Sequence, residues 1–456
     1  MSKTEHDDPK FSATGLSQTI SNSARRRLLT AVGGSAASVS LGLASGPTKA
    51  QSNPSNAHIA IAGSGLGGIA IAHRLRKLLP AAKITIVDAK QVHNYQPGYT
   101  LVASGVWPVD KVIDRNVDFI PDGVEWVQEM VADFEPSSNT LVTATGKRIK
   151  YDVLVVAIGT YQDWGLIEGM DVAAIGSNGL GSVYPSSDAA LATWKAINAF
   201  RQKGGQAVMT LPATPLKCAG APLKMTFMVR DRLKQSGTLG QSRVDFYSAL
   251  PNVFGVKPVN DNVLERWKEL DINVKTTQTL KAIDISARKA SFTAPDGQRT
   301  EVSYDFIHVV PPMRAPDAVR KSDLAWKEGP MTAGGWLEVD KETLQHRRYP
   351  NVFGLGDING TPRGKTAATV KKCAPLVAQH IVEHLSGLAL SQRFDGYTSC
   401  PLIVREGSAM LIEFDYEGRL TPSLPMIEPL QESFFAWMMK VRMLKPAYLA
   451  VLKGRV

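Results

Sequence analysis

The chain has 456 residues, a formal net charge of +10 and 44% hydrophobic residues. That length suits two or three domains with a large buried core, and the ordinary apolar fraction excludes both a disordered chain and a multi-span membrane protein. The three cysteines exclude a disulfide-rich scaffold and a four-cysteine zinc or iron–sulfur site, and we expect no metal site.

Residues 1–50 have the pattern of a targeting sequence that is removed from the mature protein. The arginines at 25–27 precede an apolar run of small residues at 31–44, and a small-residue cleavage site follows at Ala50. Paired arginines before such a run resemble a twin-arginine export signal, which predicts a periplasmic protein. The run is too short for a membrane span. An arginine-rich organellar transit peptide is the alternative, and the three acids within the first eight residues argue against it.

Residues 58–88 have the pattern of a dinucleotide-binding unit. An apolar strand at 58–62 leads into the glycine-rich turn 63–68, a helix is expected at 69–79, and a second strand at 83–87 precedes an acid. In such a unit the first glycine permits a tight turn, the second lets the backbone approach a pyrophosphate, and the third lets the helix pack on the strand. The helix N-terminus binds the phosphates, and the acid accepts hydrogen bonds from a ribose. The cofactor-binding residues predicted here are Gly63, Gly65, Gly68 and Asp88.

A second dinucleotide-type unit follows, but its glycine fingerprint is missing. The strand at 151–160, which ends in Gly159, still belongs to the first unit, and a strand at 206–211 opens the second and leads into the loop 212–222. Three prolines in that loop remove backbone donors, so the loop does not offer the row of N–H groups that a pyrophosphate needs. NAD(P)H is therefore not expected there, and the loop carries Cys218 instead.

A further segment, at 349–357, is a strand that ends in Gly356 and Asp357. Together with the glycine turn and the strand before Gly159, it resembles the two-dinucleotide-domain flavoproteins of the disulfide reductase superfamily. The resemblance implies an FAD whose ribityl chain contacts Asp357. No cysteine lies at residues 95–98, near which some relatives attach flavin covalently, so we expect non-covalent FAD.

Several longer blocks resemble the sulfide:quinone oxidoreductases, especially their mitochondrial-type branch. The blocks that carry this resemblance are 94–102, 214–222, 308–313, 340–357, 365–368 and 394–402. It extends over nearly all of the chain that follows the leader. It implies an FAD enzyme that oxidises sulfide and reduces a membrane quinone, with sulfite, a small thiol or sulfide itself as the sulfur acceptor.

The resemblance also implies a redox pair formed by Cys218 and Cys400. Sulfide would attack their disulfide, leaving a persulfide on Cys400 and a thiolate on Cys218. A thiolate needs a positive neighbour, and Lys217, Lys224 and Lys365 are the candidates among which the sequence does not choose. By resemblance, Lys365 is a catalytic residue near the flavin and the quinone.

Residues 433–455 have the composition of a membrane-interface segment. Two short apolar stretches are separated by Pro446, and from Lys440 onward there are five basic residues and no acid. Large apolar side chains interleaved with lysine and arginine are typical of an amphipathic helix on a lipid surface. A terminal helix packed on the protein itself, or a dimer contact, is the alternative. No nucleic-acid-binding module is recognisable, so nucleic acid is not expected.

These elements predict an α/β fold with two Rossmann-like, three-layer dinucleotide-binding domains. We expect an FAD domain at 57–160 and 330–400, a second Rossmann-like domain at 161–329, and a C-terminal segment at 401–456. The third thiol, Cys373, is expected to be structural. Two functional alternatives remain: the FAD subunit of a periplasmic flavocytochrome c sulfide dehydrogenase, and a flavin redox sensor or sulfur carrier without turnover. A homo-oligomer is left open.

Overall fold

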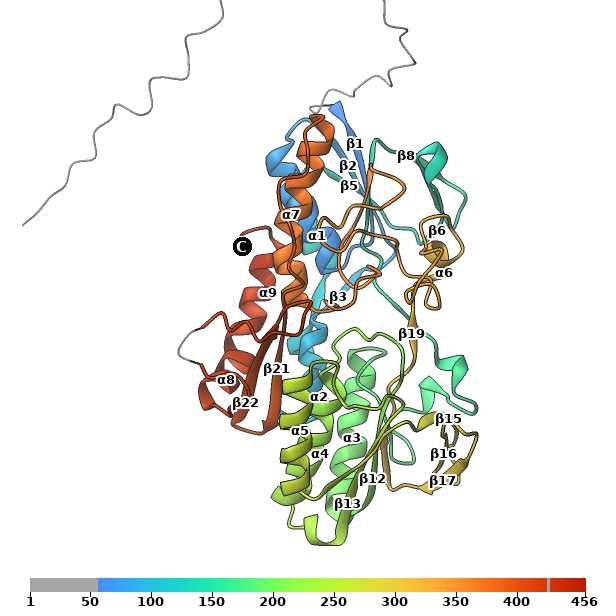
Figure 1. Cartoon of the computed structure of the whole chain (residues 1–456), viewed down its shortest axis with the longest axis vertical. Helices are drawn as coiled ribbons and strands as arrows, with labels where there is room; N and C mark the ends of the chain where they lie inside the picture. Colours follow the sequence, from blue (N-terminus) through green and yellow to red (C-terminus); the bar gives the residue numbers. More distant parts are fainter. Residues whose placement is uncertain (1–55, 425–426) are drawn as a thin grey trace, which may run out of the picture. The chain divides into compact units, whose positions relative to one another are not determined.

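The computed structural model describes residues 56–424 and 427–456. Its first parallel sheet contains the strand that leads into the glycine turn (Figure 1). The strand order is β20-β9-β1-β2-β5, and every neighbouring pair is parallel. The strands are β1 (His58–Ala62), β2 (Lys83–Val87), β5 (Val124–Val127), β9 (Val153–Val156) and β20 (Val352–Gly354). They are short and mostly apolar, as strands covered on both faces must be. Since β20 joins from far along the chain, this unit is discontinuous, as predicted.

Helix α1 (Leu66–Leu78) follows β1 and packs beside α7 (Ala367–Leu385), as Figure 1 shows. The sequence predicted a start at residue 69, but the helix begins at Leu66 because the last glycines of the turn are already helical. A Cβ on Gly68 would lie 1.8 Å from the carbonyl oxygen of Gly63. Only glycine therefore lets the first helical turn pack this closely on the turn that follows the strand.

The second parallel sheet has the strand order β11-β18-β12-β13-β14. Its strands are β11 (Leu180–Gly181), β12 (Gly205–Leu211), β13 (Ser242–Ser248), β14 (Ile272–Lys275) and β18 (Phe306–His308). The associated helices are α3 (Ser187–Lys203), α4 (Ala221–Gln235) and α5 (Lys257–Glu269). The predicted α/β fold with two Rossmann-like units is confirmed, while the exact domain boundaries stay a prediction.

Smaller elements extend both units. Two antiparallel sheets of three strands are formed by β6 (Val131–Glu135), β7 (Thr140–Thr143) and β8 (Arg148–Lys150), and by β15 (Thr279–Asp284), β16 (Lys289–Thr293) and β17 (Arg299–Ser303). Two-stranded pairs are formed by β3 (Val92–Asn94) with β4 (Ile113–Arg115), and by β10 (Tyr161–Gln162) with β19 (Met313–Arg314). The short helices are α2 (Tyr99–Ala103) and α6 (Asp317–Arg320).

The C-terminal part is a hairpin followed by helices. Strands β21 (Thr398–Arg405) and β22 (Ser408–Phe414) pack on α4 and on α8 (Phe434–Met438). A π-helical turn (Met439–Met443) then leads into α9 (Leu444–Leu452), which packs on α1. The predicted break at Pro446 is wrong, because a proline is tolerated in the first turn of a helix and Pro446 lies in that turn of α9. Among the described residues, no helix is long and apolar enough to cross a membrane.

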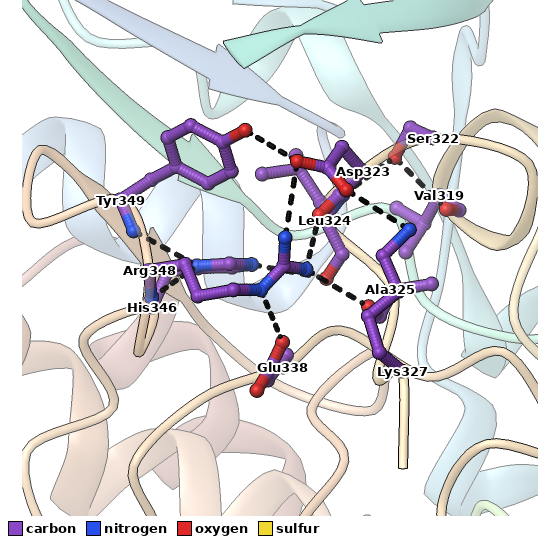
Figure 2. A network of polar contacts seen from close by, with 10 residues as sticks. All are labelled: Val319, Ser322, Asp323, Leu324, Ala325, Lys327, Glu338, His346, Arg348 and Tyr349. Atoms are coloured by element: carbon purple, nitrogen blue, oxygen red, sulfur yellow. Dashed lines mark hydrogen bonds and ion pairs between the residues drawn. The ribbon is translucent and has the colours of Figure 1, made fainter. Parts of the chain in front are cut away.

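A polar network holds the irregular segment that leads into β20, as Figure 2 shows. The guanidinium of Arg348 donates to Glu338 Oε2 at 2.8 Å and to the carbonyl of Ala325 at 3.2 Å, and it lies 3.0 Å from Asp323 Oδ2. The hydroxyl of Tyr349 donates to the same Asp323 carboxylate. The segment is otherwise paired only by isolated bridges such as Val339 with His346, and Arg348 adds side-chain bonds to them.

Candidate functional site

The residues predicted to bind FAD lie along one edge of the first sheet. The strands of this sheet are parallel, so the segments that follow their carboxyl ends meet at the same edge, where open α/β sheets bind ligands. The residues that follow these strands are Gly63, Asp88, Gly159, Gly356 and Asp357.

The glycine turn is shaped to receive a phosphate. Gly63 has a φ of +108°, and a Cβ there would lie 2.4 Å from the carbonyl oxygen of Ala157. A Cβ on Gly65 would meet no atom within 4 Å, so the space beside the turn is open. No side chain caps α1, whose first N–H groups are therefore available to an anion.

Two carboxylates near this turn differ in the hydrogen bonds that they accept. Asp88 accepts hydrogen bonds from the backbone N–H groups of Ser64 at 2.7 Å and Lys90 at 3.0 Å, which fix it beside the turn. The carboxylate of Asp357 accepts none within the described part of the chain, and burial raises its pKa against the opposing charges of Lys365 and Lys217. A carboxylate without donors suits the hydroxyl groups of a ribityl chain, so the residues present fit FAD.

Two of the three candidate lysines lie near Asp357 and do not bond the cysteines. Lys365 Nζ donates to the carbonyls of Asp357 at 2.6 Å and Asn359 at 2.8 Å, and it lies 3.8 Å from the centre of the Trp336 ring. Burial lowers its pKa to about 7. Lys217 Nζ donates to the carbonyl of Tyr184 at 3.4 Å, and burial lowers its pKa to about 8.

The structure brings Cys218 and Cys400 together, although they are far apart in the sequence. Cys218 lies in the loop between β12 and α4 with a φ of +86°, a strained conformation for a residue with a side chain. Cys400 lies in β21, and the two free thiols interact, since Cys400 is the largest cause of the lowered pKa of Cys218. A Cβ on Gly220 would lie 2.3 Å from Cys400 Sγ, so the approach of this sulfur requires a glycine at that position.

The two thiols have opposite pKa shifts, with Lys224 beside them. The hydrogen bond from Cys400, followed by the charge of Lys224, holds the pKa of Cys218 well below its ordinary value. Lys224 Nζ lies 3.7 Å from Cys218 Sγ. The bond to Cys218 and burial raise the pKa of Cys400 well above the ordinary value. Cys218 therefore loses its proton first, and Cys400 keeps its own.

Cys373 lies apart from this pair. It is buried in α7, where it packs in the hydrophobic cluster around Val370, Ala374 and Val377. Burial raises its pKa well above the ordinary value, which disfavours a reactive thiolate.

Two groups near the cysteines were not assigned to the site from the sequence. Tyr184 is buried with its hydroxyl unpartnered within the described part of the chain, and burial, then the charges of both cysteines, raise its pKa. Lys440, expected to face lipid, is only 2% exposed and donates from Nζ to the carbonyl of Pro97 at 2.6 Å. The sequence spacing could have indicated this burial. Lys440 follows the buried Ala436 and Trp437 by about one helical turn, so it lies on the same face.

A second lysine of the C-terminal segment is also turned inward. Lys445 Nζ donates to the carbonyl of Lys111 at 2.8 Å and lies 3.1 Å from Asp114 Oδ2. Nearby, the hydroxyl of Tyr448 is 2.8 Å from His93 Nε2, in a buried contact. Lys440 and Lys445 therefore contact the protein itself, as in the alternative of a terminal helix packed on the protein.

Known proteins resemble the chain in both sequence and fold. Residues 57–198 match the family described as pyridine nucleotide-disulphide oxidoreductase. Mitochondrial sulfide:quinone oxidoreductases from Mus musculus and Dictyostelium discoideum are 34% and 37% identical, over 86% and 87% of this chain and 85% and 86% of theirs. The solved structure of the Aquifex aeolicus sulfide:quinone oxidoreductase superimposes with a TM-score of 0.72 at 22% identity, covering 87% of this chain and 92% of that one.

These relatives overturn the expected periplasmic location. The Mus musculus, Dictyostelium discoideum and Schizosaccharomyces pombe proteins are all named mitochondrial. An arginine cluster before small apolar residues suits a transit peptide as well as an export signal, and the early acids were given too much weight. The leader itself lies outside the described residues.

The two curated relatives exceed 30% identity across most of their own length. The chain is therefore a member of the sulfide:quinone oxidoreductase family.

Proposed function

We propose that this protein oxidises sulfide at Cys218 and Cys400 and passes two electrons through FAD to a quinone at a mitochondrial membrane surface. The observation that carries the proposal is the interacting pair of thiols beside Lys224, with opposite pKa shifts. FAD would be held by the residues Gly63, Gly65, Gly68, Asp88, Gly159, Gly356 and Asp357. When bound, it supplies a two-electron carrier between the thiols and the quinone.

The first step is thiol–disulfide exchange on a Cys218–Cys400 bridge. Hydrosulfide attacks the sulfur of Cys400, the bond between the two cysteines breaks, and Cys218 leaves as a thiolate. The products are a persulfide on Cys400 and one thiolate, so atoms and charge balance, and the sulfide sulfur is oxidised as the bridge is reduced. A thiol of lower pKa leaves faster, which favours Cys218 as the leaving group.

The second step removes the sulfane sulfur and restores the bridge. A nucleophilic acceptor, such as sulfite, a small thiol or a second sulfide, attacks the outer sulfur and frees the Cys400 thiol. Re-forming the bridge from the Cys400 thiol and the Cys218 thiolate releases two electrons and one proton, which reduce the quinone to a quinol together with one further proton from water. Lys365, which is tied to the backbone next to Asp357, would fix the loop on which the flavin rests.

The C-terminal segment supports a position on a lipid surface. Phe434, Phe435 and Met443 are 66%, 49% and 55% exposed, and the neighbouring Arg442 is exposed as well. Apolar side chains beside a cation are typical of contact with an anionic membrane. A surface of this kind would bring the protein to a quinone dissolved in the bilayer.

The test follows the flavin absorbance of purified holoprotein under anaerobic conditions. Sulfide should bleach the flavin and a short-chain quinone should restore it. Cys218→Ser should abolish sulfide-driven bleaching, because no bridge can form, whereas Cys373→Ala should keep most of it. Bleaching by NADH but not by sulfide would contradict the proposal, and so would reoxidation by cytochrome c alone.

A further inference from the structure

Resting on the FAD site of the proposed function, we propose that the C-terminal helix α9 helps to retain FAD through a path of buried hydrogen bonds that ends at the glycine turn. The residues of this Tyr448 path are Tyr448, His93, Asn116 and Ser64. They act as positioning residues, because they fix the backbone that would receive the cofactor. The segment expected to lie on a lipid surface would then also keep FAD in place.

The first argument is the geometry at the C-terminal end of the path. The hydroxyl of Tyr448 lies 2.8 Å from His93 Nε2, and His93 Nδ1 lies 2.8 Å from Asn116 Oδ1. Burial lowers the pKa of His93 and raises the pKa of Tyr448, so at neutral pH the imidazole is uncharged and the phenol keeps its proton. An amide oxygen can only accept, so His93 donates from Nδ1 and accepts from the hydroxyl of Tyr448 at Nε2. The hydroxyl therefore supplies the donor that the buried imidazole needs.

The second argument is that Asn116 joins both sides of the predicted dinucleotide site. Its Nδ2 donates to Ser64 Oγ at 2.8 Å and to the carbonyl of Lys90 at 2.6 Å. Ser64 lies between the first two glycines of the turn, and the backbone N–H groups of Ser64 and Lys90 both donate to the carboxylate of Asp88. One amide thus ties the turn expected to receive the pyrophosphate to the acid expected to contact the ribose.

The third argument is burial. The side chains of the Tyr448 path are between 1% and 8% exposed. Water does not replace a lost partner at such positions, so breaking one bond leaves a buried polar group unsatisfied. A turn that is held in this way is already in place when the cofactor arrives, and a preorganised site binds its ligand more tightly.

The fourth argument is that α9 is fixed to the same unit at other points. Arg74, which is buried in α1, donates from Nη1 to the carbonyl of Val451 at 3.3 Å. At the start of α9, Lys445 Nζ lies 3.1 Å from Asp114 Oδ2 in β4, two residues before Asn116. The docked helix therefore holds Tyr448 at His93, and the position of α9 and the shape of the glycine turn are linked. Because such coupling is reciprocal, bound FAD should also hold α9 in place.

The test measures the release of FAD and needs neither sulfide nor quinone. Holoprotein is diluted, and free FAD is separated by rapid filtration at a series of times and measured by its fluorescence. Tyr448→Phe removes the hydroxyl but keeps the ring, whose centre lies 4.9 Å from that of Tyr95. We expect FAD to dissociate roughly tenfold faster from this variant, because the turn loses part of its support.

A second variant interrupts the path at its other end. Asn116→Leu keeps the volume of the side chain and removes its bonds to Ser64, Lys90 and His93, so FAD should again dissociate faster. The double variant Tyr448→Phe with Asn116→Leu should release FAD at about the rate of Asn116→Leu alone, because both changes interrupt one path. Effects that simply add would mean two unrelated defects and would overturn the proposal.

The matched control is Tyr416→Phe. The hydroxyl of Tyr416 donates to the carbonyl of Lys341 at 2.9 Å, so this change also removes a hydrogen bond of a largely buried tyrosine, away from the glycine turn. It should release FAD like the wild type. Equally fast release from Tyr416→Phe would assign the effect to general loosening and overturn the proposal, as would wild-type release from both Tyr448→Phe and Asn116→Leu.

A measurement on the wild type tests the reverse direction of the coupling without any variant. Amide hydrogen exchange in residues 444–452 should be faster after FAD has been released than in the holoprotein, and equal exchange would contradict the coupling. The outcome is independent of the sulfur chemistry. A protein that does not respond to sulfide, but loses FAD faster in Tyr448→Phe, would refute the proposed function and leave this inference standing.

Discussion

The two cysteines of the pair differ in their surroundings, and this difference gives the sulfur step its direction. Cys218 lies in a strained turn just before α4, where the N-terminus of the helix also favours negative charge. Cys400 lies within a regular strand and keeps its proton. In the proposed mechanism, the protein therefore distinguishes the thiol that leaves from the thiol that holds the persulfide before sulfide arrives.

A prediction at this scale concerns Gly220. A methyl group in Gly220→Ala would lie 2.3 Å from Cys400 Sγ, so the sulfur must move away and the pair must separate. After oxidation in air, the wild type should show one reactive thiol on denaturation, from Cys373, and Gly220→Ala should show all three cysteines of the chain. The measurement is a thiol titration in denaturant.

Gly255→Ala is the control for this change. A Cβ at Gly255 would meet no atom within 4 Å, and Gly255 does not have a positive φ. This variant should oxidise like the wild type. Normal bridge formation in Gly220→Ala would mean that the close approach across this glycine is not needed.

At the scale of single residues, the sequence predicted the cysteines but not their setting. Cys218 and Cys400 came from resemblance, whereas Lys224 was one of three lysines that the sequence did not separate. Which way each lysine side chain points depends on where α4 begins and on the strained turn before it. The spacing of residues in the sequence predicts neither. Lys440 was missed because its basic neighbours suggested lipid contact.

At the scale of elements, the segment before β20 is held by isolated backbone bridges and by a side-chain network. The guanidinium of Arg348 contacts Asp323, Ala325 and Glu338, which all lie earlier in the same irregular segment (Figure 2). The strand that follows leads to Gly356 and Asp357. The network thus fixes the approach of the chain to the edge of the first sheet.

Arg348→Met is expected to loosen this segment. It removes the hydrogen bonds to Glu338 and Ala325 and leaves the largely buried Glu338 carboxylate without its cation. The expected cost is about 1–3 kcal/mol in the free energy of unfolding, measured by urea denaturation. Limited proteolysis should cut between residues 323 and 349. The exposed side chain of Arg299 has no hydrogen bond or ion pair among the described residues, so Arg299→Met should change neither measurement.

The elements themselves were largely predictable, and their ends were not. Apolar runs followed by a glycine, an acid or a proline predicted β1, β2, β9, β12 and β20. The start of α1 was missed because glycines are poor helix formers in isolation, and packing on β1 overrides that preference. Pro446 was taken for a break because a proline inside an apolar run does not reveal that a helix begins just before it.

At the scale of the whole molecule, parallel sheets put residues from distant segments on common edges. The discontinuous first sheet followed from the resemblance, because nothing in the spacing alone requires β20 to return beside β9. The packing of α9 on α1 was not predictable either, since an amphipathic helix suits a protein surface as well as a lipid one.

The surface around Phe434 and Phe435 gives a prediction for the whole protein. The double variant Phe434→Asp and Phe435→Asp should lower binding to vesicles with anionic lipid at least roughly tenfold, because each exposed ring contributes apolar area on insertion. Co-sedimentation measures the binding. Reduction of a water-soluble quinone by sulfide should be unchanged. Leu166→Asp, at another exposed apolar residue, should sediment like the wild type, and equal sedimentation of the double variant would refute membrane contact at this surface.

The packing of the C-terminal segment against the cysteine loop also bears on how the protein is made. Chains emerge from the ribosome N-terminus first and fold domain by domain, so the sheet that bears Cys218 can form before Cys400 and Lys440 have been synthesised. A nascent Cys218 lacks Cys400, the neighbour that lowers its pKa most. In the proposed mechanism, sulfur chemistry therefore begins only after the late-synthesised hairpin has docked.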